Sequence, residues 1–332
     1  MEATPVISIR CEDGLTSVCY VDQGLLTSSI GGGLSIWDMT TGNTLTSSHI
    51  HRDCVYALPI DSNGQNCASM LAVQHKSGFS VFDLKTDTTL YNADVNYSNF
   101  SHICFCSSAS LLLCPSGINS IACYDVRTAI GSSDHQNGAT GPSSISIELL
   151  APTEGSTDIG CLQHIETFPH SSGYRIIAGY ETGLVSIFDL RKPQHALMTH
   201  TVDGIDTLTA FSVWRDVVLL GDSIGNVSML HISSSSDVTT LKSHNIYKGE
   251  ASTAGIGCLK IRPDGAITIA CCWDYTIRVL ETRSLYTKAI IAEHNDTIVD
   301  VCFNAQSGDF ATCGLDGNAY AWNLFNSSYK HI

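Results

Sequence analysis

The sequence predicts an all-β protein built from repeated four-stranded units. Three observations predict this class: the composition, a recurring strand pattern and the spacing of that pattern. Only 15% of the 332 residues are charged, and 27 glycines and 8 prolines interrupt the apolar runs. Such a composition favours many short strands joined by turns over long charged helices.

The recurring unit is a turn that usually contains glycine, then an alternating apolar strand ending in an anchor residue, often followed by an acid. It is clearest at residues 33–38 (GLSIWD), 78–83 (GFSVFD) and 183–189 (GLVSIFD). The seven anchors are Trp37, Phe82, Tyr124, Phe188, Leu230, Leu280 and Trp322. They lie 45, 42, 64, 42, 50 and 42 residues apart. One four-stranded propeller blade takes about 40–45 residues, so we expect residues 1–332 to form one seven-bladed β-propeller.

The remaining strands of each blade are less evenly visible. A short apolar strand and a tight turn precede each anchor strand, and a further strand lies upstream, whereas the fourth strand is weak. Residues 6–9 have no blade of their own, and the last repeat ends soon after Trp322. We therefore expect the N-terminal strand to complete the last blade and close the ring. Residues 128–158 and 233–254 exceed the repeat and are interpreted as surface insertions.

The blade pattern resembles that of WD-repeat β-propellers over essentially the whole chain. Blades of that family carry a buried, hydrogen-bonded tetrad of His, Ser or Thr, Asp and Trp. The last repeat offers His294, Thr312, Asp316 and Trp322 at matching spacing. The resemblance implies that this tetrad is structural.

The stretch CCWDYTIRVL at residues 271–280 combines two thiols, an indole and a carboxylate. Asp274 stands six residues before the anchor Leu280, as Asp316 does before Trp322, so Asp274 is expected in a turn. Cys271 and Cys272 fall on the preceding strand, where successive side chains point to opposite faces. The two adjacent thiols are thus a poor chelate.

No catalytic, metal or cofactor motif gains support from its surroundings. Residues 221–225 (GDSIG) match the nucleophile elbow, but a strand follows where that motif needs a helix. Cys104 and Cys106 lack a second Cys or His pair at metal-ligand spacing. Residues 31–33 (GGG) lack the phosphate-loop pattern. We expect neither an enzyme nor a bound cofactor.

The charge and the cysteines restrict the partner and the compartment. A formal charge of −15 with scattered Lys and Arg disfavours direct binding to nucleic acid or to anionic membranes. Most of the 14 cysteines sit in apolar strand-like runs, as buried free thiols do. No secretory signal is recognised at residues 1–12, so a reducing cytoplasmic or nuclear location is expected.

A narrower resemblance rests on residues 178–189 (AGYETGLVSIFD), 261–265 (IRPDG) and 273–279 (WDYTIRV). These are similar to the family of guanine nucleotide-binding protein subunit beta-like protein 1 and its fungal counterpart, ASTRA-associated protein 1. The resemblance implies a cofactor of the cochaperone machinery that matures phosphatidylinositol-3-kinase-related kinases, linked to chromatin-remodelling assemblies. The chain departs from that family in having Cys272 where a glycine is usual.

Two other functions stay open. One is a WD-repeat hydrolase of the diphthamide methylesterase type, which a deep central pocket with His and carboxylate side chains of perturbed pKa would favour. The other is an adaptor in a nuclear pore or a ubiquitin ligase.

The expected partner-binding face is formed by the turns between second and third strands together with the turns between blades. Its candidate residues are Tyr180, Glu181, Trp273 and Tyr275, because aromatic side chains bind at low entropic cost and carboxylates suit a basic partner. Asp274 and Asp316 are expected to brace their turns.

Overall fold

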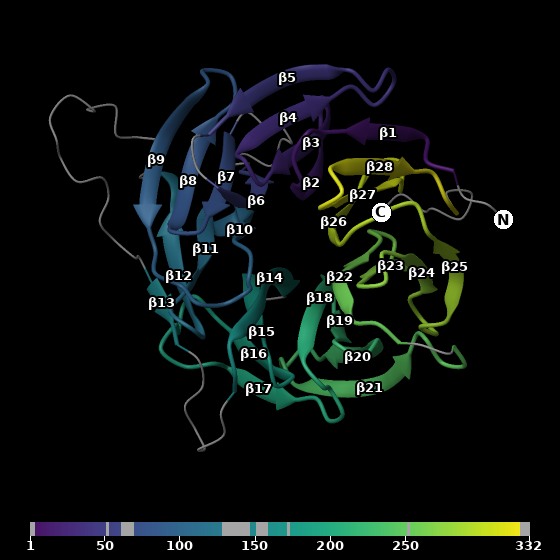
Figure 1. Ribbon diagram of the computed structural model, residues 1–332. Coiled ribbons are helices and arrows are strands. Elements are labelled where there is room, and N and C mark those ends of the chain that lie inside the picture. Colours follow the sequence, from purple (N-terminus) through teal and green to yellow (C-terminus); the bar gives the residue numbers. More distant parts are fainter. Residues whose placement is uncertain are drawn as a thin grey trace, which may run out of the picture.

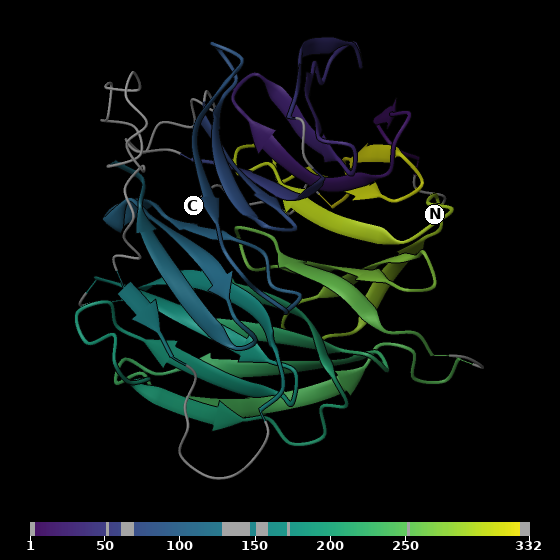
Figure 2. The same ribbon diagram turned by 60° about the vertical axis from the view of Figure 1, so that its left-hand side comes forward.

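The computed structural model describes residues 4–50, 53–60, 70–127, 147–150, 159–170, 173–250 and 253–325. Its strands form seven separate four-stranded antiparallel sheets, arranged as the blades of a ring (Figures 1 and 2). The predicted all-β, seven-bladed propeller is therefore confirmed. Within the described residues the helical structure named as an element is the single 3-10 turn Ser107–Ala109.

Six blades are built from four strands in chain order, counted outward from the axis, and the last blade takes its outer strand from the N-terminus. The innermost strands are β2 (Leu15–Val21), β6 (Cys54–Pro59), β10 (Cys104–Cys106), β14 (Leu162–His170), β18 (Leu208–Trp214), β22 (Ile256–Ile261) and β26 (Ile298–Phe303). The second strands are β3 (Gly24–Ser29), β7 (Met70–His75), β11 (Leu111–Ser116), β15 (Gly173–Tyr180), β19 (Val217–Asp222), β23 (Ile267–Cys272) and β27 (Phe310–Gly314).

The third strands carry the seven anchors at or near their C-terminal ends. They are β4 (Gly33–Trp37), β8 (Gly78–Asp83), β12 (Ser120–Asp125), β16 (Leu184–Phe188), β20 (Asn226–Ile232), β24 (Ile277–Glu281) and β28 (Asn318–Trp322). The outer strands are β5 (Thr44–His49), β9 (Thr88–Asp94), β13 (Ile147–Leu149), β17 (Met198–Thr201), β21 (Val238–Asn245), β25 (Thr287–Ile291) and β1 (Ile7–Arg10).

The N-terminal strand β1 is the outer strand of the last blade. It pairs with β28 from Ile7 opposite Ala321 to Arg10 opposite Asn318. The ring is thus closed by both ends of the chain, as predicted, and β28 is not left as an open edge.

The hydrophobic core lies between blades. Each of seven buried clusters takes its side chains from two adjacent blades, and together they fill the seven interfaces of the ring. Two neighbours in the sixth blade show the principle, because Cys271 packs toward the seventh blade and Cys272 packs toward the fifth. The two thiols therefore diverge, as expected.

Hydrogen bonds from backbone amides to side-chain oxygens of the neighbouring blade link the inner strands of adjacent blades. The amide of Val18 donates to Asp300 Oδ2 at 2.9 Å and joins the last blade to the first. The amide of Ala57 donates to Ser17 Oγ at 3.1 Å, and that of Ile261 donates to Ser212 Oγ at 3.0 Å. These bonds satisfy buried polar groups that would otherwise weaken the interfaces.

The interpretation of residues 128–158 and 233–254 as surface insertions is wrong in part. Residues 128–146 and 151–158 lie outside the described residues, but 147–149 form β13, the outer strand of the third blade. Within 233–254, Val238–Asn245 form β21, which pairs with β20 along its length. Both segments therefore supply the fourth strands that the sequence pattern left weak.

Candidate functional site

The four tetrad side chains of the last blade form one continuous chain of hydrogen bonds. His294 Nδ1 lies 3.0 Å from Asp316 Oδ2, and His294 Nε2 lies 3.0 Å from Thr312 Oγ1. Trp322 Nε1 donates to the same Thr312 hydroxyl at 3.2 Å. His294, Thr312 and Trp322 are buried, so the chain pins the β27–β28 turn to the loop before β26. Asp316 also accepts the amides of Asn295 and Asn318, both at 3.0 Å.

Ionisation of the tetrad follows from these contacts. Burial lowers the pKa of His294, although Asp316 opposes the shift, so the imidazole is neutral at neutral pH. Burial alone would raise the pKa of Asp316, but the two donated amides and His294 outweigh it and hold that pKa below its usual range. The neutral His294 ring therefore has a structural role, because it links the Asp316 carboxylate to the Thr312 hydroxyl through one hydrogen bond on each ring nitrogen.

The first blade carries a shorter version of this arrangement. Trp37 Nε1 donates to Thr27 Oγ1 at 2.9 Å, across the same pair of strands and with the same separation of ten residues. Thr27 was missed in the sequence, although its spacing from Trp37 matches that of Thr312 from Trp322.

The expected partner face holds an exposed aromatic pair in the β23–β24 turn. Trp273 is 46% exposed and Tyr275 is 43% exposed. The turn is tight, because the Cys272 amide donates to the Thr276 carbonyl at 2.9 Å and Tyr275 has a positive φ of 64°. Asp274 accepts the Thr276 hydroxyl at 2.6 Å and so braces the turn.

The Trp273 ring lies against the backbone of Gly255. A Cβ at that glycine would come within 2.4 Å of the indole, so only glycine lets the ring lie this close. The Trp273 amide also donates to the Gly255 carbonyl at 2.9 Å. One side of the indole is thus packed while nearly half of the residue remains open to a partner.

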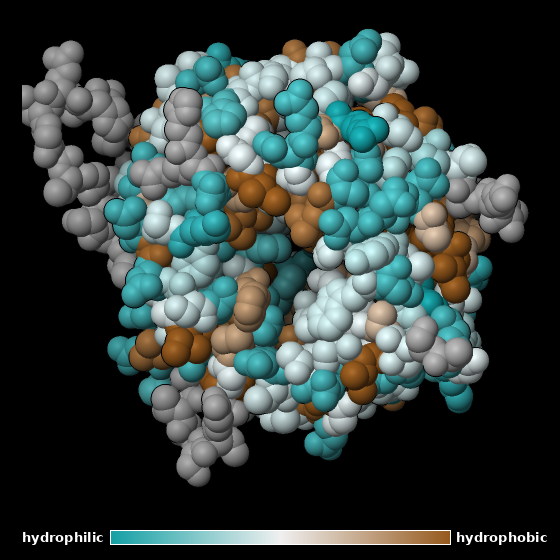
Figure 3. All heavy atoms as spheres, in the orientation of Figure 1, coloured by the Kyte–Doolittle hydropathy of each residue, from teal (hydrophilic) through white to brown (hydrophobic). Residues whose placement is uncertain are grey.

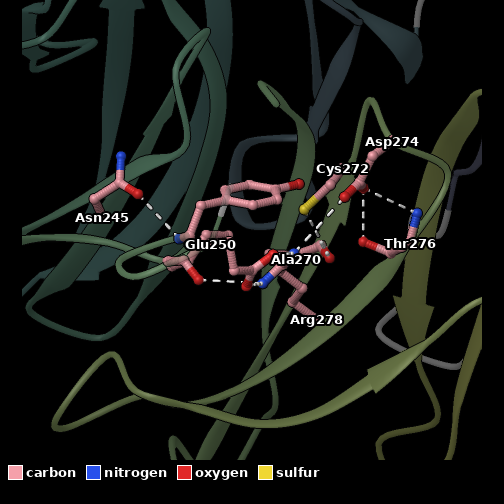
Figure 4. Close-up of polar contacts among 9 residues, drawn as sticks. Asn245, Glu250, Ala270, Cys272, Asp274, Thr276 and Arg278 are labelled. Carbon is pink, nitrogen blue, oxygen red and sulfur yellow. Dashed lines mark hydrogen bonds and ion pairs between the residues drawn. The ribbon is translucent and has the colours of Figure 1, made fainter. Parts of the chain in front are cut away.

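Beneath this turn, the buried guanidinium of Arg278 ties three segments together (Figure 4). It donates to both carboxylate oxygens of Glu250, at 2.6 and 2.8 Å, and to the Ile246 carbonyl at 3.2 Å. It lies 3.7 Å above the centre of the Tyr247 ring and 3.7 Å from Asp274 Oδ2. The third strands of four other blades have a small serine at this position, two residues before the anchor. Arg278 therefore gives the sixth blade a brace of its own.

We expect Arg278→Met to loosen the segment between β21 and β22. The change keeps an apolar stem but removes the bidentate bond and the stacked cation, which lowers the free energy of unfolding by about 1–3 kcal/mol. Hydrogen exchange should rise at residues 245–250. Arg127→Met is the matched control, because Arg127 is exposed and pairs with Asp125 at the surface. Equal exchange in both variants would contradict the bracing role.

Two of the predicted face residues lie differently from expectation. Tyr180 is fully buried, because β15 extends through it opposite Leu162 and turns its side chain into the core. It is therefore not a partner-binding residue. Glu181 is half-buried and accepts the Cys161 amide at 3.2 Å, so it has a structural contact within its own blade.

Exposed aliphatic side chains occupy the equivalent turns of other blades and were missed in the sequence. They are Ile30, Ile118, Ile224 and Leu315, each at least 38% exposed. Together with Trp273 and Tyr275 they give five of the seven blades an apolar contact point in the turn between second and third strands. Their shared position one or two residues after the second strand was the available signal.

A channel runs along the axis of the ring and has a cavity volume of about 620 Å³. The innermost strands of all seven blades line it. Figure 3 shows a hollow at the centre of the ring, with hydrophilic residues visible inside it. Its ionisable side chains are His102, His164, Glu166, Lys260 and Asp300, together with Tyr56 and four cysteine thiols.

Burial shifts the pKa of several channel groups. It lowers the pKa of His102 and of His164 to about 4, in the second case with help from Lys260. It raises the pKa of Asp300 to about 6. Glu166 Oε1 lies 2.7 Å from Lys260 Nζ and raises the pKa of that lysine. This is a central pocket with perturbed His and carboxylate groups, the feature expected to favour a hydrolase.

The channel carboxylates are, however, engaged with the framework. Glu166 Oε2 accepts the Val213 amide at 2.6 Å, and Asp300 accepts the amides of Val18 and Val301 at 2.9 and 2.8 Å. His102 is stacked on Tyr56 with ring centroids 4.3 Å apart. No hydrogen bond between a nucleophilic side chain and a histidine is recorded among the described channel residues. Ser223 of the GDSIG stretch lies in the β19–β20 turn, as predicted, and donates to Asp206.

The described residues contain no group of three or more His, Cys, Asp or Glu side chains that could hold a metal ion. None of their helices is both long enough and apolar enough to cross a bilayer. The 13 cysteines among them are all free.

A closed ring of seven four-stranded blades, with a His–Thr–Asp–Trp chain in the last one, has the architecture of a WD-repeat β-propeller. Among known proteins, the chain is similar to "Guanine nucleotide-binding protein subunit beta-like protein 1" of Mus musculus. The two are 27% identical over 190 residues, which make up 55% of this chain and 55% of the mouse protein. The match thus spans about half the length of that relative. No protein-family model matches the sequence.

Proposed function

We propose that this chain is a non-enzymatic scaffold that binds protein partners through the turns between its second and third strands. The observation that carries the proposal is the half-exposed pair Trp273 and Tyr275. The turn that presents this pair is braced by Asp274, which accepts the Thr276 hydroxyl and lies beside the buried Arg278. A rigid aromatic pair contributes contact area with little loss of side-chain entropy on binding. The propeller fold and the similarity to the mouse protein support an interaction role in general.

The narrower proposal concerns the kind of partner. We infer a cofactor of the cochaperone machinery that matures phosphatidylinositol-3-kinase-related kinases, with links to chromatin-remodelling assemblies. Its support is the family resemblance of residues 178–189, 261–265 and 273–279, together with the similarity to the mouse protein over about half of its length. This role places the chain in the cytoplasm, the nucleus or both.

Co-purification tests the narrower proposal. Tagged full-length chain, recovered from its native cells and examined by mass spectrometry, should bring down a subunit of the kinase-maturation cochaperone. Recovery of G-protein γ-subunits or nuclear-pore components instead, with no cochaperone subunit, would refute this assignment. Recovery of ubiquitin-ligase subunits would favour the adaptor function.

The ionisable groups of the channel favour one alternative, a hydrolase of the diphthamide methylesterase type. Asp300, His102 and His164 are the channel groups available to it, although no nucleophile is aligned with them among the described residues. Release of methanol from a methyl-ester protein substrate by the purified chain would support this alternative, provided that Asp300→Asn abolishes it. Equal rates with and without the chain would remove the alternative.

A further inference from the structure

The axial channel has an internal order that the strand registers define. Six of the seven innermost strands have a register irregularity after their first residue, which brings Tyr56, His164, Cys258 and Asp300 to the same level. Glu166 and Lys260 lie two residues further along their strands and form the next level. The channel thus contains two successive layers of polar side chains, and the second layer holds the ion pair between Glu166 and Lys260.

The charges in the two layers do not cancel. Among the described residues that line the channel, the charged side chains other than histidine are Glu166, Lys260 and Asp300. Glu166 uses one carboxylate oxygen for Lys260 and the other for the Val213 amide. Both histidines are neutral at neutral pH because burial lowers their pKa. One negative charge therefore remains, and it resides on Asp300.

Asp300 has acceptor capacity left for a ligand. Each of its oxygens accepts one backbone amide, from Val18 and from Val301. A carboxylate oxygen can accept about two hydrogen bonds, so one position on each oxygen is unused by these contacts. Asp300 also lines the cavity, where a ligand can reach it.

An aromatic surface lies on the opposite side of β2 from Asp300, because Asp300 is in β26 and Tyr56 is in β6. Tyr56 and His102 are stacked with an interplanar angle of 8°, and both line the channel. At the same level of the intervening strand, Ser17 is buried and bonded to the Ala57 backbone. Asp300 is the largest cause of the raised pKa of Tyr56, which places the carboxylate within electrostatic reach of the phenol.

A cavity with one uncompensated carboxylate and a flat aromatic surface suits a cation on an apolar stem. We propose that the channel binds an organic cation, a guanidinium or primary ammonium group, with the charge at Asp300 and the stem against Tyr56 and His102. The source of the cation is either a free amine or the Arg or Lys side chain of a bound peptide. The site is separate from the β23–β24 turn and does not depend on the scaffold function.

Calorimetric titration of the full chain with matched small probes tests the proposal. The probes are N-acetyl-arginine amide, its neutral isostere N-acetyl-citrulline amide, and N-acetyl-glutamate amide. We expect binding of the arginine probe, with an affinity about tenfold or more above that of the citrulline probe, and no binding of the glutamate probe. Equal affinities for arginine and citrulline, preference for glutamate, or no binding of arginine would overturn the proposal.

Three variants make the result specific to the channel. Asp300→Asn should weaken binding of the arginine probe by about tenfold or more. Lys260→Gln should strengthen it, because Glu166 then adds a second uncompensated charge, and this variant decides the matter if Asp300→Asn does not fold. Asp94→Asn removes an exposed carboxylate from an outer strand and should leave the affinity unchanged. Unchanged affinity in both channel variants would contradict the assignment of the site.

A last comparison distinguishes the two sources of the cation. Agmatine carries the guanidinium as a small amine, whereas a capped Gly-Gly-Arg-Gly-Gly peptide carries it as a side chain. Tighter binding of the peptide identifies a protein side chain as the ligand, and tighter binding of agmatine identifies a free amine. Binding of neither contradicts the proposal.

Discussion

Replacing Trp322 with alanine is expected to lower the free energy of unfolding by about 3–5 kcal/mol. The indole is fully buried between the last two blades and stacks near Phe310 with ring centroids 6.1 Å apart. Its removal leaves a cavity and takes away the donor that Thr312 accepts. Denaturant unfolding followed by circular dichroism measures the loss.

The matched control for this prediction is Tyr286→Ala. Tyr286 is also aromatic, but it is 63% exposed and lies just before β25, the outer strand of the sixth blade. Loss of its side chain should therefore lower the free energy of unfolding by well under about 1 kcal/mol. If Trp322→Ala shifted the melting temperature by no more than about 1 °C, the indole would not have the supporting role assigned to it.

Removal of residues 1–10 is expected to open the ring. The deletion takes away β1, whose four residues pair with β28, and the buried side chain of Ile9. With about 1 kcal/mol for each lost hydrogen bond and the lost burial of Ile9, the expected loss is about 4 kcal/mol or more. The exposed edge of β28 should also promote self-association.

Removal of residues 1–4 is the control, because the pairing with β28 begins after them, at the bond from the Val6 amide to the Ala321 carbonyl. Thermal melting and light scattering of the two deletions are compared. If the longer deletion melted like the shorter one and stayed monomeric, closure of the ring by β1 would contribute nothing to stability.

The anchors were readable because the preceding turns repeat along the chain and five of the seven anchors are buried. Phe188, Leu230, Leu280 and Trp322 are fully buried, so each needed an apolar residue at the same strand position. The outer strands gave a weak pattern for the opposite reason. In β21 only the first residue, Val238, is buried, so the remaining residues show no apolar alternation.

The partner face was only partly predictable. Trp273 and Tyr275 lie in an exposed turn as expected, whereas Tyr180 belongs to the preceding strand, one position before the turn begins. Alternation along a strand then directs its side chain inward. A shift of one residue in the expected end of a strand was enough to exchange an exposed side chain for a buried one.

The channel was beyond the reach of sequence reasoning. Glu166 and Lys260 are 94 residues apart and meet only because the ring brings β14 and β22 to the same axis. The level at which Asp300 and His164 stand depends on irregularities in the strand register, which have no clear residue signature. Single charged residues in apolar strands were therefore not recognised as one cluster.

Capture of the native partner by wild-type chain and by the Trp273→Ala/Tyr275→Ala double variant tests the central claim most directly. Glu181 is left unchanged because it bonds within its own blade. Tyr286→Ala/Ile290→Ala, which alters two exposed residues on the outer part of the same blade, is the control. We predict that the double variant melts near the wild-type temperature and recovers about tenfold less partner or lower, while the control recovers a normal amount. Normal recovery by the folded double variant would show that the partner does not bind the β23–β24 turn.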